Sequence, residues 1–127
     1  MAEHRVPQWH PIAALPMIGQ AIDGMLDSAE EVVQSLEQAR PRPHVFDDAT
    51  IGRVREAHGT QRNDVWWYTE QLARWQRASP TRVQAQELAR LTQQLTALRR
   101  VLTASLALAE ALQSGTMEKY GPRTRGN

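Results

Sequence analysis

The sequence has no cysteine and few aromatic residues, and its charges almost cancel. Its 127 residues include four Trp, two Tyr and one Phe, and 15 basic and 14 acidic residues leave a net charge of +1. The absence of cysteine excludes disulfides, thiolate nucleophiles and cysteine-ligated metal sites. The near-zero net charge argues against a protein dedicated to binding nucleic-acid phosphates, which would be clearly basic.

Long apolar runs are also absent. No stretch approaches the roughly 20 apolar residues of a membrane span, and the N-terminal sequence MAEHRVPQWHP lacks the hydrophobic centre of a signal peptide. We therefore expect a cytoplasmic protein with no membrane association. Arginine supplies 14 of the 15 basic residues, which we interpret first as the codon bias of a GC-rich bacterial genome.

The sequence does contain three stretches in which core-type positions recur at alternating spacings of three and four. This spacing places a stripe along one side of a helix and is typical of left-handed, coiled-coil-like packing. The first stripe is Leu15, Ile18, Ile22, Met25, Ala29, Val32, Leu36 and Ala39. The second is Ile51, Val54, His58, Gln61, Val65, Tyr68, Leu72 and Trp75. The third is Leu88, Leu91, Leu95, Leu98, Leu102, Ser105, Ala109 and Leu112.

Proline, aspartate and glycine mark the expected ends of these helices, which we predict over 12–40, 48–78 and 80–114. Asp48, or Asp47 before it, is suited to cap the second helix. Ser79 followed by Pro80 is typical of an N-cap and a first helical residue, and so predicts the start of the third. Gly115 is the expected left-handed C-cap at its end.

Both connections are short, so consecutive helices must lie antiparallel. The sequence therefore predicts a single all-α domain, 1–127, built as an up-down-up bundle of three long helices. We expect residues 1–10 to form an irregular arm and 116–127 to form a mobile tail. If the first helix begins at Pro11 rather than at Pro16, Pro16 should kink it.

Two polar residues interrupt the second stripe. His58 and Gln61 occupy core-type positions, level with Ala29 and Leu98 when residues are counted from the turns. Because buried polar side chains need hydrogen-bond partners, we interpret the pair first as a buried polar layer that fixes the helix register. Two alternatives stay open: His58 acts as a proton carrier or pH switch, or the helix breaks near Gly59 and leaves His58 exposed.

Trp66 and Trp67 form the second irregularity. If Val65 and Tyr68 face the core, both tryptophans point outward. Large aromatic side chains are enriched at interfaces, and two adjacent ones on a surface need a cover. The candidate covers are the arm that carries Trp9, a second copy of the chain, and a foreign partner or ligand.

The residues on either side of Trp66 favour a second copy. Gly59 and Ala73 each lie seven residues from Trp66 and therefore share its face of the helix. Two such helices could cross antiparallel, with Trp66 of one copy over Gly59 of the other.

The sequence offers no basis for a catalytic, cofactor or metal site. None of its histidines, His4, His10, His44 and His58, is three or four residues from another. No HExxH motif and no glycine-rich phosphate loop occurs. The acids of the first helix lie mostly off its core stripe, as a solvated face would. We therefore expect a protein that is not an enzyme.

The leading functional hypothesis is a small helical interaction or assembly module, most simply a homodimer. Its candidate contact residues are Trp66, Trp67, Gly59 and Ala73, and another protein is a second partner class. The alternative is a nucleic-acid-associated accessory or regulatory protein that uses basic residues of the third helix and the tail. These residues are Arg90, Arg99, Arg100, Arg123 and Arg125, although no helix-turn-helix signature accompanies them.

Overall fold

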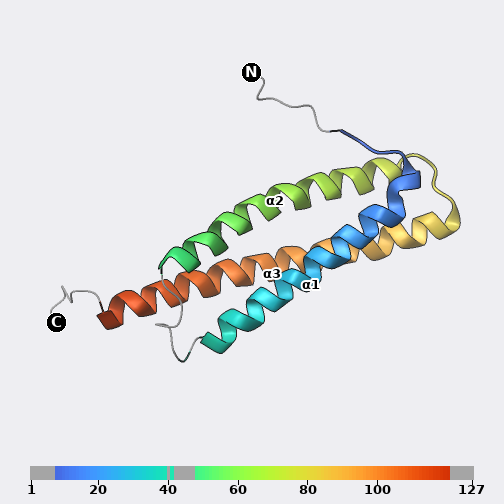
Figure 1. Ribbon diagram of the computed structural model, residues 1–127. Coiled ribbons are helices and arrows are strands. Elements are labelled where there is room, and N and C mark those ends of the chain that lie inside the picture. The colour runs from blue at the N-terminus through green and yellow to red at the C-terminus, as the bar shows by residue number, and fades with distance from the viewer. Residues whose placement is uncertain (1–7, 40, 42–47, 121–127) are drawn as a thin grey trace, which may run out of the picture.

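The computed structural model describes residues 8–39, 41 and 48–120, and this part of the chain is built from helices and their connections (Figure 1). A short 3₁₀ helix, η1 (Ile12–Ala14), leads into α1 (Leu15–Ala39), which is followed by α2 (Asp48–Gln76) and α3 (Arg82–Tyr120). Successive α-helices run in opposite directions, and α1 and α2 both pack along α3. The predicted all-α, up-down-up bundle of three helices is confirmed.

Helix α3 is the scaffold of the bundle. All positions of its predicted stripe are buried, and none of their residues is more than 5% exposed: Leu88, Leu91, Leu95, Leu98, Leu102, Ser105, Ala109 and Leu112. The stripe alternates between spacings of three and four, which keeps it on one side of a helix many turns long. Because this stripe is continuous, α3 offers a packing surface along the length of both other helices.

The ends of α1 and α2 follow the predictions closely. Helix α1 begins at Leu15, so Pro16 lies in the first turn, where its missing amide hydrogen breaks no helical bond and its predicted kink does not arise. Residues 40 and 42–47 lie outside the described part of the chain, which includes the possible cap Asp47. Helix α2 begins at Asp48 and is continuous to Gln76, two residues short of the predicted end.

The predicted start of α3 is wrong. Ser79 is not an N-cap but has a left-handed φ of 55° beyond the end of α2, and Pro80 disfavours the right-handed helical conformation at this residue. Thr81 caps α3 instead. Its Oγ1 accepts a 3.1 Å bond from the Gln84 amide, and its own amide donates a 2.9 Å bond to Oε1 of Gln84. Thr-x-x-Gln is a capping box.

The predicted end of α3 is also wrong. Gly115 does not terminate the helix, which continues to Tyr120. A glycine inside a helix costs only about 1 kcal/mol relative to alanine, and Met117, Glu118 and Lys119 beyond it are good helix formers. Residues 116–120 of the predicted tail are therefore helical, and 121–127 lie outside the described part.

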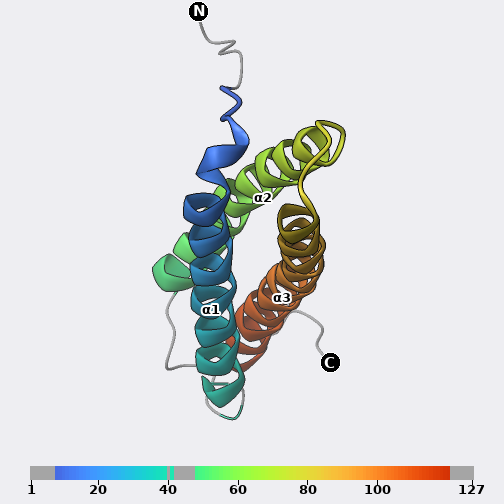
Figure 2. The same ribbon diagram turned by 90° about the vertical axis from the view of Figure 1, so that its right-hand side faces the viewer.

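The core is divided into two clusters along the bundle axis. The larger surrounds the first halves of α1 and α3 and the second half of α2, whereas the smaller contains Leu36, Ala39, Ile51, Ala109 and Leu112. Helix α2 contributes no buried residue between Ile51 and Val65, a span of about 21 Å at 1.5 Å per residue. Figure 2 shows α2 crossing behind α1 while α3 diverges from α1 toward the upper end. We call residues 52–64, the part of α2 that contributes no buried residue, the waist.

Two glycines of α1 provide a test of this packing. A Cβ at Gly19 would lie 3.1 Å from Oε2 of Glu87 and 3.4 Å from Cδ1 of Leu91, whereas a Cβ at Gly24 would have no neighbour within 4 Å. We predict that Gly24→Ala stabilises the protein by roughly 0.5–1 kcal/mol through helix propensity. Gly19→Ala should gain less or destabilise, because Glu87 and Leu91 must shift. Chemical denaturation of both variants measures this, and equal stabilisation would contradict the close contact of α1 with α3.

Candidate functional site

The predicted polar layer lies at the waist but is not buried. His58 and Gln61 are both half-buried, and within the described part of the chain neither side chain has a hydrogen-bond partner. The residues that share a hollow of about 230 Å³ with them include Ala29 and Ser105, which are too small to close it. The pair shares this hollow with Ala29, as predicted, but its neighbours there on α3 are Leu102 and Ser105 rather than Leu98, and the pair is accessible. Because α2 is continuous here, a helix break at Gly59 is not the reason.

The two tryptophans have different environments. Trp66 is 54% exposed, whereas Trp67 is half-buried under the chain that precedes η1. The ring of Trp9 stacks on Trp67 at 5.7 Å between centroids and an interplanar angle of 8°. The Arg74 guanidinium lies 4.1 Å from the centroid of the Trp9 ring, a cation–π arrangement. The arm is therefore the cover of Trp67, one of the alternatives that the sequence left open.

Residues Gln8–His10 are fixed to α2 by hydrogen bonds as well as by ring stacking. The His10 amide donates a 2.7 Å bond to Oε1 of Gln71, and the His10 carbonyl accepts a 2.9 Å bond from Nε1 of Trp75. Gln71 and Trp75 are one helical turn apart, so one side chain reaches the backbone amide of His10 and the other reaches its backbone carbonyl. Both are almost fully buried, at 1% and 4% exposed. We call this contact the arm clasp.

Burial also affects the phenol below the arm clasp. The ring of Tyr68 meets Trp67 edge to face at 5.3 Å between centroids. Desolvation, with a smaller contribution from the nearby Asp64 carboxylate, raises the pKa of Tyr68. Tyr68 packs against the larger core cluster.

A groove runs between α2 and α3, and Trp66 is one of the residues that line it. Its volume is about 530 Å³, and only these two helices line it. The lining residues are His58, Arg62, Val65, Trp66, Thr69, Arg99, Leu102, Thr103 and Leu106. Ala73, another predicted contact residue, lines the continuation of this groove beyond Thr69. The structure thus places His58, Trp66 and Ala73 along one groove, while Trp67 belongs to the arm clasp.

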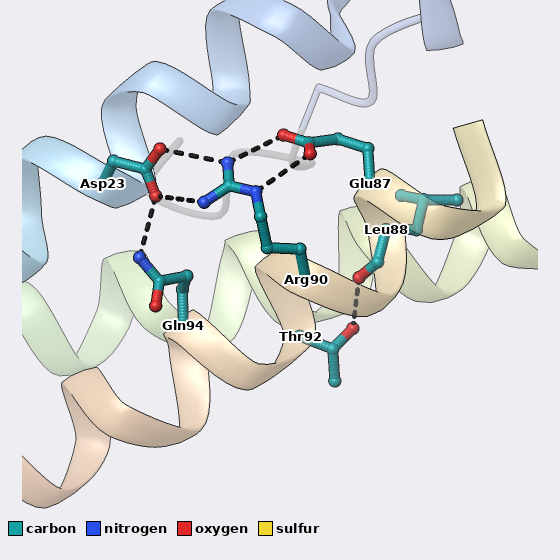
Figure 3. Close-up of polar contacts among 6 residues, drawn as sticks. All are labelled: Asp23, Glu87, Leu88, Arg90, Thr92 and Gln94. Atoms are coloured by element: carbon teal, nitrogen blue, oxygen red, sulfur yellow. Dashed lines mark hydrogen bonds and ion pairs between the residues drawn. The ribbon is translucent and has the colours of Figure 1, made fainter. Parts of the chain in front are cut away.

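Arg90 is engaged within the chain (Figure 3). Its Nη1 and Nη2 donate 3.1 and 3.0 Å bonds to the two carboxylate oxygens of Asp23, and its Nε and Nη2 donate 2.9 and 2.8 Å bonds to Glu87. Gln94 donates a further 3.0 Å bond to Asp23. The guanidinium lowers the pKa of both carboxyl groups, and they raise the pKa of Arg90. The network is exposed, so it fixes the position of α1 on α3 more than it adds stability.

The remaining arginines of the nucleic-acid alternative are not gathered into one patch with Arg90. Nη2 of Arg99 donates a 2.7 Å bond to Oγ1 of Thr69 across the groove, and Arg100 is exposed beside it. Arg123 and Arg125 lie outside the described part of the chain.

No protein-family model, curated protein or solved structure matched the chain in our comparisons. Among the residues that the structure describes, no group of three or more His, Asp or Glu side chains is arranged to hold a metal ion. In the same part of the chain, no helix combines the length and the apolar character needed to cross a membrane. A functional interpretation therefore rests on the surface of the bundle itself.

The contacts of Gln71, Arg99, Glu87 and Asp23 were not predicted from the sequence, in which Arg99 was a candidate only for nucleic-acid contact. Gln71 and Arg99 stand at positions with no distinguishing pattern, because their partners come from the arm and from the opposite helix. The Glu87–Arg90 pair has the i, i+3 spacing of a helical ion pair and was recognisable. Its extension to Asp23 depends on how α1 and α3 are rotated against each other.

The arm clasp is testable by removing its ring. We predict that Trp9→Ala exposes Trp67, which shifts the tryptophan emission to longer wavelength and lowers the free energy of unfolding by about 1 kcal/mol, as expected for one aromatic stacking pair. Trp9→Phe is the matched control, because it also removes the emission of Trp9 but keeps a ring on Trp67. Identical emission maxima and stabilities for the two variants would show that the arm does not cover Trp67.

Proposed function

We propose that the protein is a non-enzymatic helical interaction module that associates with a second copy of itself through the outer face of α2. The observation that carries this proposal is the exposure of Trp66. It is 54% exposed although the ring of Trp9 lies 6.5 Å from its ring and stacks on Trp67 next to it. A large exposed indole flanked by polar residues is the usual centre of a protein interface.

Gly52 and Gly59 of α2 also favour this face of the helix as the contact surface. An added Cβ at Gly52 or at Gly59 would meet no atom within 4 Å, so nothing in the described part of the chain requires glycine at these positions. A glycine inside a helix is nevertheless less stable than alanine by about 1 kcal/mol. A helix from outside the chain that approaches α2 closely would account for both glycines, because neither has a Cβ to hold it away.

One pair of opposite charges matches in the antiparallel register, whereas the two Arg62 side chains lie within one residue of each other at its centre. When Trp66 of one copy lies over Gly59 of the other, Arg55 of each copy is level with Glu70 of its partner. Arg55 is exposed and Glu70 is half-buried, so both side chains are within reach of a second helix. A twofold contact repeats every pair twice, and two such ion pairs would fix the register at the rim of the buried tryptophans.

The other partners considered from the sequence have less support. A different protein could use the same face, but the match of Arg55 with Glu70 is a property of two copies. A nucleic-acid role would have to rely on Arg99, Arg100 and the arginines after residue 120, because two carboxylates neutralise Arg90.

Self-association is tested by the mass in solution. We predict that the 14.4 kDa chain forms dimers at tens of micromolar, measured by light scattering after size exclusion. Trp66→Ala should weaken the dimer by roughly 2 kcal/mol, about thirtyfold in dissociation constant, as for a central contact residue. Gly59→Leu should do the same by blocking close approach, while circular dichroism shows unchanged helix content.

Val83→Ala is the matched control, because Val83 is 74% exposed but lies at the start of α3, away from this face. A wild-type monomer at these concentrations would contradict the proposal. If Trp66→Ala stays as dimeric as Val83→Ala, the interface lies elsewhere.

A further inference from the structure

The groove between α2 and α3 has a chemistry that self-association does not use. All of its ionisable lining residues are basic types, namely His58, Arg62 and Arg99, and no Asp or Glu lines it. In a chain with a net charge of only +1, a groove of this size without a carboxylate is a local concentration of positive potential.

The two arginines of the groove keep their charges uncompensated. Arg62 projects from α2 and has no ion-pair partner in the described part of the chain. Arg99 projects from α3 and donates to the neutral hydroxyl of Thr69. Arg90 on the same helix is instead held by two carboxylates. Arginines with only neutral partners are available to bind an anion through paired N–H donors.

The rest of the groove is mostly apolar. Val65, Leu102 and Leu106 line it, Trp66 is its large aromatic residue, and Thr69 and Thr103 add two hydroxyl groups. Its volume of about 530 Å³ is within the range of small-ligand sites, which are mostly apolar with a few polar groups that orient the ligand. A ligand that satisfies this lining has an anionic head and an apolar body.

The ends of the groove favour a compact ligand over a long helix. The hydrogen bond from Arg99 to Thr69 crosses the groove at one end, and His58 lines the other. Residues 58 and 69 of α2 are about 16 Å apart along the helix axis. The same groove of a second copy is excluded as the occupant, because it would bring like charges together.

We infer that this groove binds one small amphipathic anion, a carboxylate or phosphate attached to an apolar chain or ring. Arg62 and Arg99 would hold the anionic group, while Val65, Leu102 and Leu106 would contact the apolar body. The groove and the proposed dimer contact share Trp66, but the anion site needs only residues of a single chain and does not require self-association.

Isothermal titration calorimetry with amphiphiles below their micelle-forming concentrations tests the inference. Laurate and dodecyl phosphate should bind saturably at one molecule per chain. Dodecyltrimethylammonium, which has the same chain and the opposite charge, should bind at least tenfold more weakly. Inorganic phosphate alone should also bind at least tenfold more weakly, since it lacks the apolar body.

Two sets of variants locate the site. Arg62→Gln combined with Arg99→Gln should weaken laurate binding at least tenfold, whereas Arg100→Gln, which removes a neighbouring exposed charge outside the groove, should leave it unchanged. Thr103→Phe should block the groove sterically, with Thr96→Phe on the same helix as its control. All of the substituted side chains are exposed, so the variants should fold. If one variant does not fold, the other variant with its control still tests the site.

Several results would overturn the inference: no binding of laurate or dodecyl phosphate, equal binding of the cationic amphiphile, or binding that neither set of variants weakens. Tight binding to phosphatidylglycerol vesicles without binding of monomeric laurate would indicate a membrane surface instead. Binding of an acidic amphipathic peptide without either small amphiphile would indicate a helical protein partner. Light scattering on the same samples reports self-association separately, so a monomer that binds laurate would refute the proposed dimer and keep the groove.

Discussion

The structure depends on one constraint, the continuous buried stripe of α3. Both other helices pack against this stripe, and its residues belong to both core clusters. Apolar burial contributes about 25 cal/mol per Å², so a helix that is buried along one whole side dominates the stability of a small bundle. Helices α1 and α2 can then differ in how completely they are buried, provided that each retains contacts with α3.

Helix α2 is buried less completely than α3. It contributes Ile51 to one cluster and Val65, Leu72 and Trp75 to the other, and its waist contributes no buried side chain. The hollows around His58 lie on both sides of this waist, and Gly52 and Gly59 within it face open space. The arm clasp strengthens the second half of α2 by covering Trp67 and bonding to Gln71 and Trp75. The result is a helix fixed at both ends, with an accessible middle that carries Gly52 and Gly59 and ends just before Trp66.

Much of this arrangement could be predicted from the sequence, because a stripe of three- and four-residue spacings determines which side of a helix is buried. The α3 stripe was predicted residue by residue, and the topology followed from the short connections. Helix ends were less predictable, since Ser79-Pro80 and Thr81-x-x-Gln84 are competing start signals only two residues apart. Trp67 was predicted to point outward but is half-buried and packs against the larger core cluster. Its cover was not decided, because the hydrogen bonds of the arm clasp depend on side chains 61 and 65 residues away in the sequence. The accessibility of His58 was not predicted, because the spacing pattern indicates which way a side chain faces. It does not indicate how completely the residues of α1 and α3 opposite His58 fill the space around it.

Hydrogen–deuterium exchange at two protein concentrations tests the central claim that the waist of α2 is weakly packed and available to a partner. In dilute solution, amides of residues 52–64 should exchange faster than those of 65–75 and of the α3 stripe, because few buried contacts oppose local opening. At high concentration, added protection should be confined to α2, centred between Gly59 and Trp66. Uniformly slow exchange along α2 in dilute solution, or added protection on α1 or α3 alone, would contradict the account.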